Sequence, residues 1–204
     1  MKYKWLNNKK SNSDIIIFFN GWGMDESVVN HLNPDDFNVL MFYDYETLET
    51  DFDFAVLLNY SRKYLVAWSM GVMTATLFDI NYDFKTAVNG TLTPIDDKYG
   101  IPERIYNLTV KGFSPKGAER FIKSMFNEEC NFPKPIRSFE EQKNELAALS
   151  KYKSKKDFQY DRVILSSEDK IIPTKNQINF WQKPSNLHSG HYPFKEFLNW
   201  KDLV

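Results

Sequence analysis

Four short apolar runs, each long enough for one buried strand, set the strongest limit on how this chain can fold. They occupy residues 14–20, 37–43, 64–68 and 85–89. An unbroken apolar run of roughly 4–8 residues is typical of a strand buried on both faces, as in a parallel sheet. The segments 25–32, 51–60 and 69–80 between them have a helical pattern. The alternation predicts an α/β fold, with a mostly parallel sheet and helices on both faces.

The alternation stops between residues 91 and 157. Five of the nine prolines fall in this stretch, around two segments of helical pattern near 115–126 and 137–150. A strand pattern returns at 162–165, and helical patterns follow near 174–182 and 193–200. We therefore expect a core made of residues 1–90 and 158–204, with residues 91–157 inserted into it as a helical lid.

Composition and charge narrow the possible partners. The chain of 204 residues carries 26 basic and 27 acidic side chains, a formal net charge of −1, which argues against nucleic acid as the main partner. No apolar run approaches the roughly 18 residues of a membrane span, and no export signal is visible. We expect a cytoplasmic protein that does not bind a membrane.

The cysteine content excludes two further kinds of site. Cys130 is the single cysteine, so an internal disulfide and a multi-cysteine metal site are both ruled out. A lone cysteine can still act as a nucleophile, but Glu128 and Glu129 precede this one directly. Because neighbouring carboxylates disfavour the thiolate, a catalytic role for Cys130 is not expected.

The most specific motif follows the third apolar run. Residues 67–71 read Ala-Trp-Ser-Met-Gly and lie between a strand and an apolar helical segment. This is the position of the nucleophile elbow of α/β-hydrolases, whose pattern is Gly-x-Ser-x-Gly. The residues two before and two after the serine must be small because we expect them to crowd each other; Gly71 fits, and Ala67 is the next smallest choice. Ser69 is thus the candidate nucleophile, the alternative being a serine that caps the helix starting at Met70.

A nucleophilic serine needs a histidine base. His191 lies after the last strand-like segment, 185–189, and before the last helix, where this fold places its histidine. His31 belongs to a surface helix by its pattern. His188 and His191 have a spacing that metal sites use, but no third ligand cluster accompanies them, so no metal is expected.

The histidine in turn needs an acid that orients it. The chain order of this fold is serine, acid, histidine, which places the acid in the loop 166–173 after the strand 162–165. Glu168 and Asp169 are both candidates, and Asp169 is favoured because an Ile-Ile-Pro segment that starts a helix follows it closely. The alternative role for either carboxylate is to cap the helix near Thr174.

Two backbone N–H groups are needed to stabilise the oxyanion of an acyl-transfer reaction. One is expected from Met70, the residue after the nucleophile, and the other from the loop after the first apolar run. That loop, residues 20–24, reads Asn-Gly-Trp-Gly-Met, and its glycines allow a close approach of the backbone to a substrate. We assign the second donor to Trp22; the alternative is a plain glycine-rich turn.

Taken together, these motifs resemble one family. Residues 19–24 (Phe-Asn-Gly-Trp-Gly-Met), 67–72 (Ala-Trp-Ser-Met-Gly-Val), 169–173 (Asp-Lys-Ile-Ile-Pro) and 190–194 (Gly-His-Tyr-Pro-Phe) are similar to the biotin-pathway pimeloyl-[acyl-carrier-protein] methyl ester esterases of the BioG type. The resemblance spans nearly the whole chain. It implies hydrolysis of the methyl ester of pimeloyl-acyl-carrier protein, which releases methanol, with Ser69 as nucleophile, His191 as base and Asp169 as acid. It implies an acyl-carrier protein as the partner and no cofactor or metal. We expect the protein to be a monomer.

The lid offers a separate argument about that partner. In a helix over 115–126, Lys116, Arg120 and Lys123 share one face, and the opposite face is apolar. Acyl-carrier proteins are acidic, so a basic face on the lid is expected to steer them. The alternative is a solvated amphipathic helix with no partner. Two other readings of the whole chain stay open: a general small-molecule carboxylesterase or thioesterase with the same triad, and a non-catalytic binding protein of the hydrolase fold.

Overall fold

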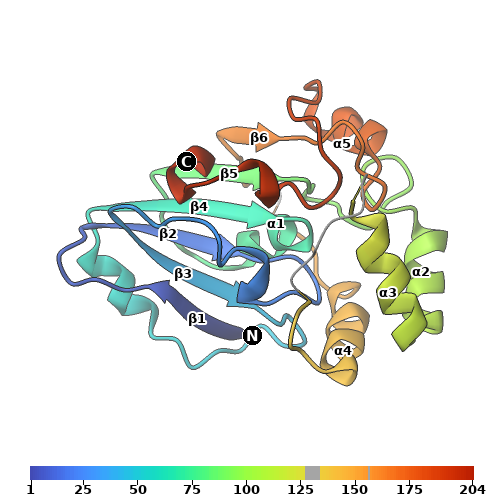
Figure 1. The fold of residues 1–204 in the computed structure, drawn as a ribbon, viewed down its shortest axis with the longest axis horizontal. Helices are drawn as coiled ribbons and strands as arrows, with labels where there is room; N and C mark the ends of the chain where they lie inside the picture. Colours follow the sequence, from blue (N-terminus) through green and yellow to red (C-terminus); the bar gives the residue numbers. More distant parts are fainter. Residues whose placement is uncertain (127–133, 156) are drawn as a thin grey trace.

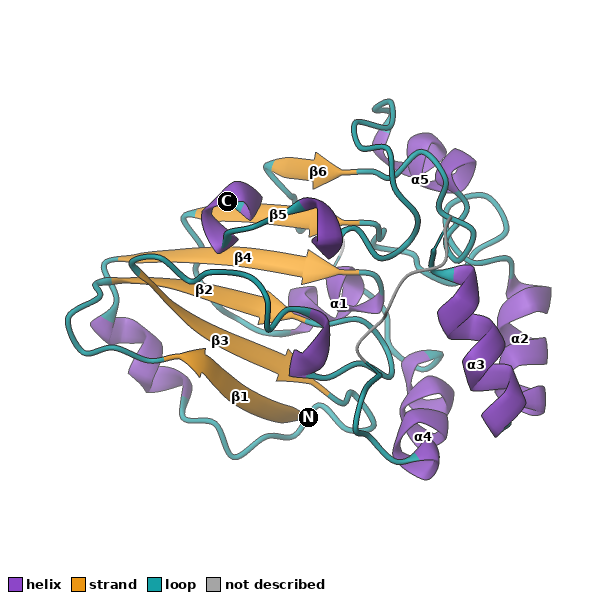
Figure 2. Ribbon diagram, in the orientation of Figure 1, coloured by secondary structure: helices purple, strands orange, loops and turns teal. Residues whose placement is uncertain are grey.

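The computed structural model describes residues 1–126, 134–155 and 157–204 and is built around a six-stranded sheet (Figures 1 and 2). The strand order is β1-β3-β2-β4-β5-β6. β1 pairs antiparallel with β3, and every other pair is parallel. The strands are β1 (Lys2–Asn7), β2 (Asp14–Phe19), β3 (Phe37–Tyr43), β4 (Arg62–Trp68), β5 (Phe84–Val88) and β6 (Arg162–Ile164). The predicted α/β fold with a mostly parallel sheet is confirmed.

Side chains alternate between the two faces of the sheet, and each face has its own core. On β2, Ile15, Ile17 and Phe19 belong to one cluster, and Ile16 and Phe18 belong to the other. All five are fully buried, which explains why this strand shows as a continuous apolar run. The first core is covered by α1 (Met70–Thr74), by the 3-10 turns Phe54–Asn59 and Ala75–Leu77, and by the lid. The second is covered by the 3-10 turns Glu26–Val28, Phe194–Glu196 and Trp200–Leu203.

Several predicted helices are much shorter than expected. The segments 25–32, 51–60 and 193–200 form 3-10 turns, and the segment 69–80 contains α1 followed by a 3-10 turn. In the first of these, the amide of Val29 donates to the carbonyl of Glu26, and Asp25 caps the turn. These connections are short and place only a few apolar side chains on the sheet. A 3-10 turn, with its i→i+3 hydrogen bonds, is long enough for this, so no full α-helix is needed.

The segment 91–157, which we propose acts as a lid and call the lid below, has three helices in its described residues, and they lie beyond the carboxyl ends of the parallel strands (Figure 1). They are α2 (Glu103–Gly112), α3 (Pro115–Ser124) and α4 (Phe139–Leu149). The two predicted helices of this stretch correspond to α3 and α4, whereas α2 was not predicted. Ser114 and Ser138 cap α3 and α4 by accepting from the amides of Gly117 and Glu141.

The chain returns from the lid to the sheet through β6 and then α5 (Thr174–Trp181). Cys130 and its two neighbouring glutamates lie outside the described residues. Among the residues that are described, no helix has both the length and the apolar character needed to cross a membrane.

Candidate active site

The connections of the sheet place a crevice beside the carboxyl ends of β2 and β4. These two strands are neighbours, and the chain leaves β2 toward β3 on one side but leaves β4 toward β5 on the other. In open α/β sheets, ligands bind where neighbouring connections diverge in this way. The loop after β2 carries Trp22, and the turn after β4 carries Ser69.

Ser69 occupies a strained turn between β4 and α1. Its backbone angles are φ 57° and ψ −123°, a conformation that a non-glycine residue adopts only when its surroundings enforce it. The Ser69 amide donates to the carbonyl of Val88 at 3.0 Å, which ties the turn to β5. The alternative role as a helix cap is absent, since the Ser69 side chain makes no capping hydrogen bond to α1. A strand–turn–helix of this shape presents the serine hydroxyl at the edge of the sheet.

The need for a glycine at position 71 has a different cause from the one we predicted. A Cβ on Gly71 would lie 2.3 Å from the carbonyl oxygen of Phe19 and 2.6 Å from that of Asn20. The nearest obstacles therefore belong to the end of β2 and not to Ala67. The turn accommodates a methyl group at position 67, where Ala67 is fully buried, although this residue departs from the Gly-x-Ser-x-Gly pattern.

The three residues predicted as a triad meet in one hydrogen-bonded chain. Ser69 Oγ lies 2.8 Å from His191 Nε2, and His191 Nδ1 lies 2.7 Å from Asp169 Oδ2. All three residues are buried. If Nδ1 carries the ring proton toward the carboxylate, Nε2 is free to accept the proton of the serine hydroxyl, the arrangement that nucleophilic catalysis requires.

The carboxylate that contacts the histidine is Asp169, not Glu168. Asp169 Oδ1 accepts from the amides of Ile171 and Ile172 at 2.8 and 3.0 Å, and Oδ2 accepts from Gln177 Nε2 at 2.8 Å. These donors fix the position and orientation of the Asp169 carboxylate. Glu168 is exposed, and its Oε1 lies 3.7 Å from Nδ1 of the exposed His188 ring. No sequence pattern predicts the Gln177 contact, because it depends on how α5 packs against this loop.

Two further residues hold the histidine loop and were not anticipated. Trp68 Nε1 donates to the carbonyl of His191 at 2.9 Å. Asn89 Nδ2 donates to the carbonyls of Gly190 and His191 at 3.1 and 3.0 Å, and its Oδ1 accepts from the amide of Ser166. Asn89 has a positive φ of 42°, a conformation that asparagine tolerates better than most residues. It links the end of β5 to the loops of both the acid and the histidine.

The loop after β2 has most of its amides occupied by protein acceptors. Gly21 N donates to Asn20 Oδ1 at 2.8 Å, Gly23 N to Glu145 Oε2 at 3.0 Å, and Met24 N to the carbonyl of Gly21 at 3.3 Å. Among the hydrogen bonds of the described residues, none uses the amide of Trp22. Met70, as the first residue of α1, has no acceptor within its own helix.

A cavity of about 520 Å³ opens over these groups, between the strand ends and the lid. This size falls within the range of roughly 300–1,000 Å³ that is usual for small-molecule sites. Ser69 and His191 form part of its wall, and much of the remaining wall is apolar and comes from the lid and the loop after β2. The apolar lining includes Trp22, Ile101, Ile105, Tyr106, Leu108, Phe113, Phe121 and Leu146.

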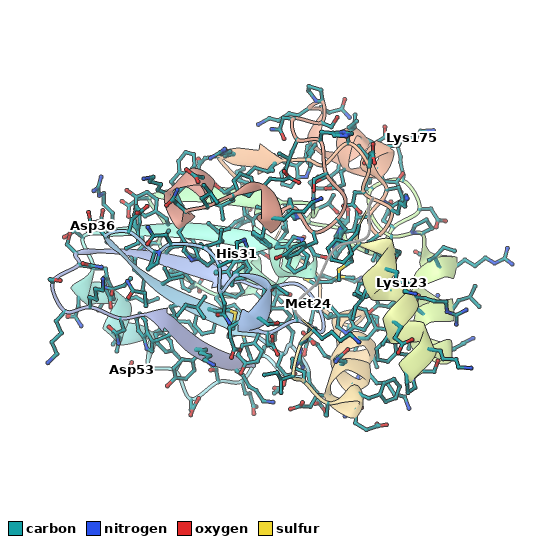
Figure 3. The ribbon with its side chains drawn as sticks, viewed as in Figure 1. Met24, His31, Asp36, Asp53, Lys123 and Lys175 are labelled. Atoms are coloured by element: carbon teal, nitrogen blue, oxygen red, sulfur yellow. The ribbon has the colours of Figure 1, made fainter. Side chains whose placement is uncertain are left out.

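The predicted basic face of α3 is only partly connected to this cavity. Arg120 lines it, as does Lys170, whereas Lys116 and Lys123 do not. All three α3 cations are exposed, and Lys123 is labelled on α3 in Figure 3. In the part of the chain that the structure describes, Arg120 and Lys170 take part in no ion pair. Arg120 thus belongs both to the outer face of the lid and to the cavity wall.

The two other histidines lie outside this arrangement. His31 (Figure 3) lies 2.9 Å from the carbonyl of Phe194 through Nε2, and His188 is exposed beside Ser167. Within residues 1–126, 134–155 and 157–204, no group of three or more His, Cys, Asp or Glu side chains is placed to hold a metal ion.

Comparison with known proteins gives a consistent result. The family described as "Pimeloyl-ACP methyl esterase BioG" matches residues 1–203. A malonyl-[acyl-carrier protein] O-methyltransferase of Bacteroides fragilis is 37% identical over 198 residues, which cover 89% of this chain but only 40% of that protein.

Solved structures agree with the sequence matches. BioG from Haemophilus influenzae superposes with a TM-score of 0.90 at 33% identity, covering 100% of this chain and 99% of that one. A putative aryl esterase from Burkholderia cenocepacia, at 14% identity and a TM-score of 0.66, covers 95% of this chain and 88% of its own and shares the fold.

Proposed function

The chain belongs to the BioG family of pimeloyl-ACP methyl esterases, and we propose that it hydrolyses the methyl ester of pimeloyl-[acyl-carrier protein] by a serine mechanism. The observation that carries this proposal is the hydrogen-bonded chain from Ser69 through His191 to Asp169 at the wall of an apolar cavity. The apolar lining suits a chain of methylene groups, and the position of Ser69 in the cavity wall supports a role in attacking an ester bound there.

Acylation uses groups that are already in contact. Ser69 Oγ attacks the ester carbonyl carbon while its proton passes to His191 Nε2, 2.8 Å away. The N–H groups of Trp22 and Met70 stabilise the oxyanion of the tetrahedral intermediate. The intermediate collapses, the bond to the methoxy oxygen breaks, and His191 delivers its proton to that oxygen to give methanol. Asp169 stabilises the imidazolium throughout.

Deacylation repeats these steps with water. His191 Nε2 takes a proton from the attacking water, the same two amides stabilise the second oxyanion, and the proton returns to Ser69 Oγ as the acyl bond to the enzyme breaks. The products are a free carboxylate on the pimeloyl chain and the regenerated enzyme. No residue in this sequence of steps requires a cofactor.

Substitution of the three residues tests the assigned roles. Ser69→Ala is expected to lower kcat by about 10⁴–10⁶-fold, and Asp169→Asn by about 10⁴-fold because it favours the wrong histidine tautomer. Glu168→Gln is the matched control, since it changes the neighbouring carboxylate that makes no contact with His191. A Ser69→Ala protein that keeps more than about a tenth of its activity would exclude Ser69 as nucleophile.

The natural substrate is tested separately. We expect kcat/KM to be far higher for the carrier-linked pimeloyl methyl ester than for short p-nitrophenyl esters, and we expect expression of the protein to rescue a biotin auxotroph that lacks this esterase step. Equal rates on all esters, with no rescue, would favour a general carboxylesterase. Release of the whole acyl chain from the carrier would favour a thioesterase.

A further inference from the structure

Helix α4 of the lid is bonded directly to the loop that carries Trp22. Gly23 N donates to Glu145 Oε2 at 3.0 Å, and Trp22 Nε1 donates to the carbonyl of Gln142 at 2.7 Å. Both contacts join residues more than a hundred positions apart in the sequence. The loop is therefore held from the lid side as well as by the strand that precedes it.

The side chain of Glu145 is completely buried, which is unusual for a glutamate. An ionised carboxylate is costly to bury unless donors satisfy it. Glu145 Oε2 accepts from Gly23 N and from Arg137 Nη1, and Glu145 Oε1 accepts from Tyr45 N at 3.0 Å. Every one of these partners is a donor, so this position needs a group that accepts on both oxygens.

The charge of Glu145 is balanced within the same cluster. The Arg137 side chain is only 4% exposed and pairs with Glu145 and, at 2.8 Å, with Asp44. Asp44 in turn pairs with Lys2 at 2.9 Å. Arg137 and Lys2 thus link the carboxylates of Glu145 and Asp44 in one network that ties α4 to the ends of β1 and β3, and Glu141 joins it only at its outer end, through Lys2.

The same cluster fixes the first part of the loop through Tyr45. Glu145 holds the Tyr45 amide, and the Tyr45 hydroxyl donates to the carbonyl of Asn20 at 2.8 Å. The peptide groups on both sides of the Trp22 amide are therefore anchored: Asn20 through Tyr45, and Gly23 through Glu145. The amide between these anchors is the one assigned to the oxyanion.

We propose that Glu145 is a positioning residue for catalysis, which holds the loop after β2 so that the Trp22 N–H points at the oxyanion. This proposal rests on the proposed serine mechanism. It gives α4 a role beyond lining the cavity, because a displacement of this helix would move the oxyanion donor.

The most direct test is the substitution Glu145→Gln. It keeps the size of the side chain, but the amide NH₂ group must face one of the three donors that Glu145 now accepts from, so that hydrogen bond is lost. On a p-nitrophenyl ester, we expect kcat to fall about 10–100-fold with KM within about threefold, because an oxyanion donor acts mainly in the transition state. The Ki of a boronic acid, which mimics the tetrahedral intermediate, is expected to rise by a similar factor.

Glu141→Gln is the matched control. Glu141 lies one turn earlier on α4 and contacts Ser138 and Lys2 but not the loop. We expect kcat and the boronate Ki of this variant to stay within about twofold of the wild type. A folded Glu145→Gln protein with unchanged kcat and Ki would overturn the proposal, as would a change in KM alone.

Two further measurements keep the test decisive if Glu145→Gln does not fold. Glu145→Asp keeps the charge that pairs with Arg137 but withdraws the carboxylate from Gly23, so we expect about a 10-fold loss in kcat with KM held; a lower melting temperature with unchanged kcat would contradict the proposal. In the wild type, hydrogen exchange at Gly23 should be as slow as in α4, and fast exchange of the loop beside a protected α4 would contradict it.

These outcomes are distinct from failure of the proposed function. If the serine mechanism is wrong, the wild type does not hydrolyse p-nitrophenyl esters through Ser69 and does not bind the boronic acid. If only the role of Glu145 is wrong, the wild type does both, and the Glu145 variants do so equally well.

Discussion

Gly71→Ala gives a sharp test of how the elbow is packed against β2. A Cβ at this position would lie 2.3 Å from the carbonyl oxygen of Phe19 and 2.6 Å from that of Asn20. Cβ atoms essentially never lie closer than 3.0 Å to a non-bonded heavy atom, so the two segments must separate by about 0.7 Å, the difference between 3.0 and 2.3 Å. Both obstacles are backbone atoms, which cannot rotate away as a flexible side chain can.

This separation acts directly on the site. Phe19 and Asn20 lead into the loop that carries Trp22, and Gly71 follows Ser69 and Met70, so the substitution moves the two proposed oxyanion donors, the amides of Trp22 and Met70, apart. A misplacement of about 1 Å can cost 10²-fold in rate, so we expect kcat/KM on a p-nitrophenyl ester to fall about 30–100-fold. Overpacking of this kind costs about 1–3 kcal/mol of stability.

The assay is steady-state ester hydrolysis combined with urea unfolding of the same samples. Gly112→Ala is the matched control, because nothing lies within 4 Å of a Cβ at that position, at the end of α2. Gly112 lines the cavity, so this variant serves as the control for stability, which should stay the same or rise by less than about 1 kcal/mol. A Gly71→Ala protein with wild-type stability and activity would refute the packing argument.

Three other substitutions test separate features. Arg120→Glu should raise KM for the carrier-linked ester about 3–10-fold, more than for a small ester, and the effect should shrink in steady-state assays at high salt because exposed charges are screened. Asn89→Ala should lower stability by about 3 kcal/mol in urea unfolding and reduce kcat, because the carbonyl of His191 loses a donor and alanine is strained at positive φ. The hydrogen bond from Lys2 lowers the pKa of Glu141 to about 2 in the folded protein, compared with about 4.3 in the unfolded chain. The ionised carboxylate therefore stabilises the fold at pH values above about 4.3, and this stabilisation is lost as the pH falls toward 2. Glu141→Gln should therefore cost about 0.5 kcal/mol at pH 7, a value typical of exposed pairs, and progressively less in urea unfolding below about pH 4.3.

The central strands could be predicted from the sequence because both of their faces are buried. The apolar runs at 37–43 and 64–68 correspond to β3 and to most of β4, and the run at 14–20 corresponds to β2. The edge strand β1 was missed, since Lys2 and Lys4 are exposed and its pattern lacks a continuous apolar run. Helix lengths were overestimated because a short amphipathic pattern fits a 3-10 turn as well as an α-helix.

The part of the site that could be predicted from the sequence is the part set by the order of the strands and loops along the chain. Ser69, Asp169 and His191 each follow a strand-like segment, and the order of the parallel strands brings their loops to the same edge of the sheet. Glu145 could not be found in this way, because a charged residue on a lid helix has the pattern of a solvated surface. Only the packing of α4 against the loop after β2 shows that its carboxylate is buried and bonded to Gly23.

The central claim is that Ser69 cleaves the methyl ester and leaves the rest of the acyl chain on its carrier. Intact-mass spectrometry of pimeloyl-[acyl-carrier protein] methyl ester, incubated with the wild type or with Ser69→Ala, tests this claim most directly. We predict that the wild type lowers the mass of the carrier by one methylene group, the change from methyl ester to acid, and that Ser69→Ala leaves the mass unchanged. Loss of the whole acyl chain, or the same loss of one methylene at equal rates with both proteins, would contradict it.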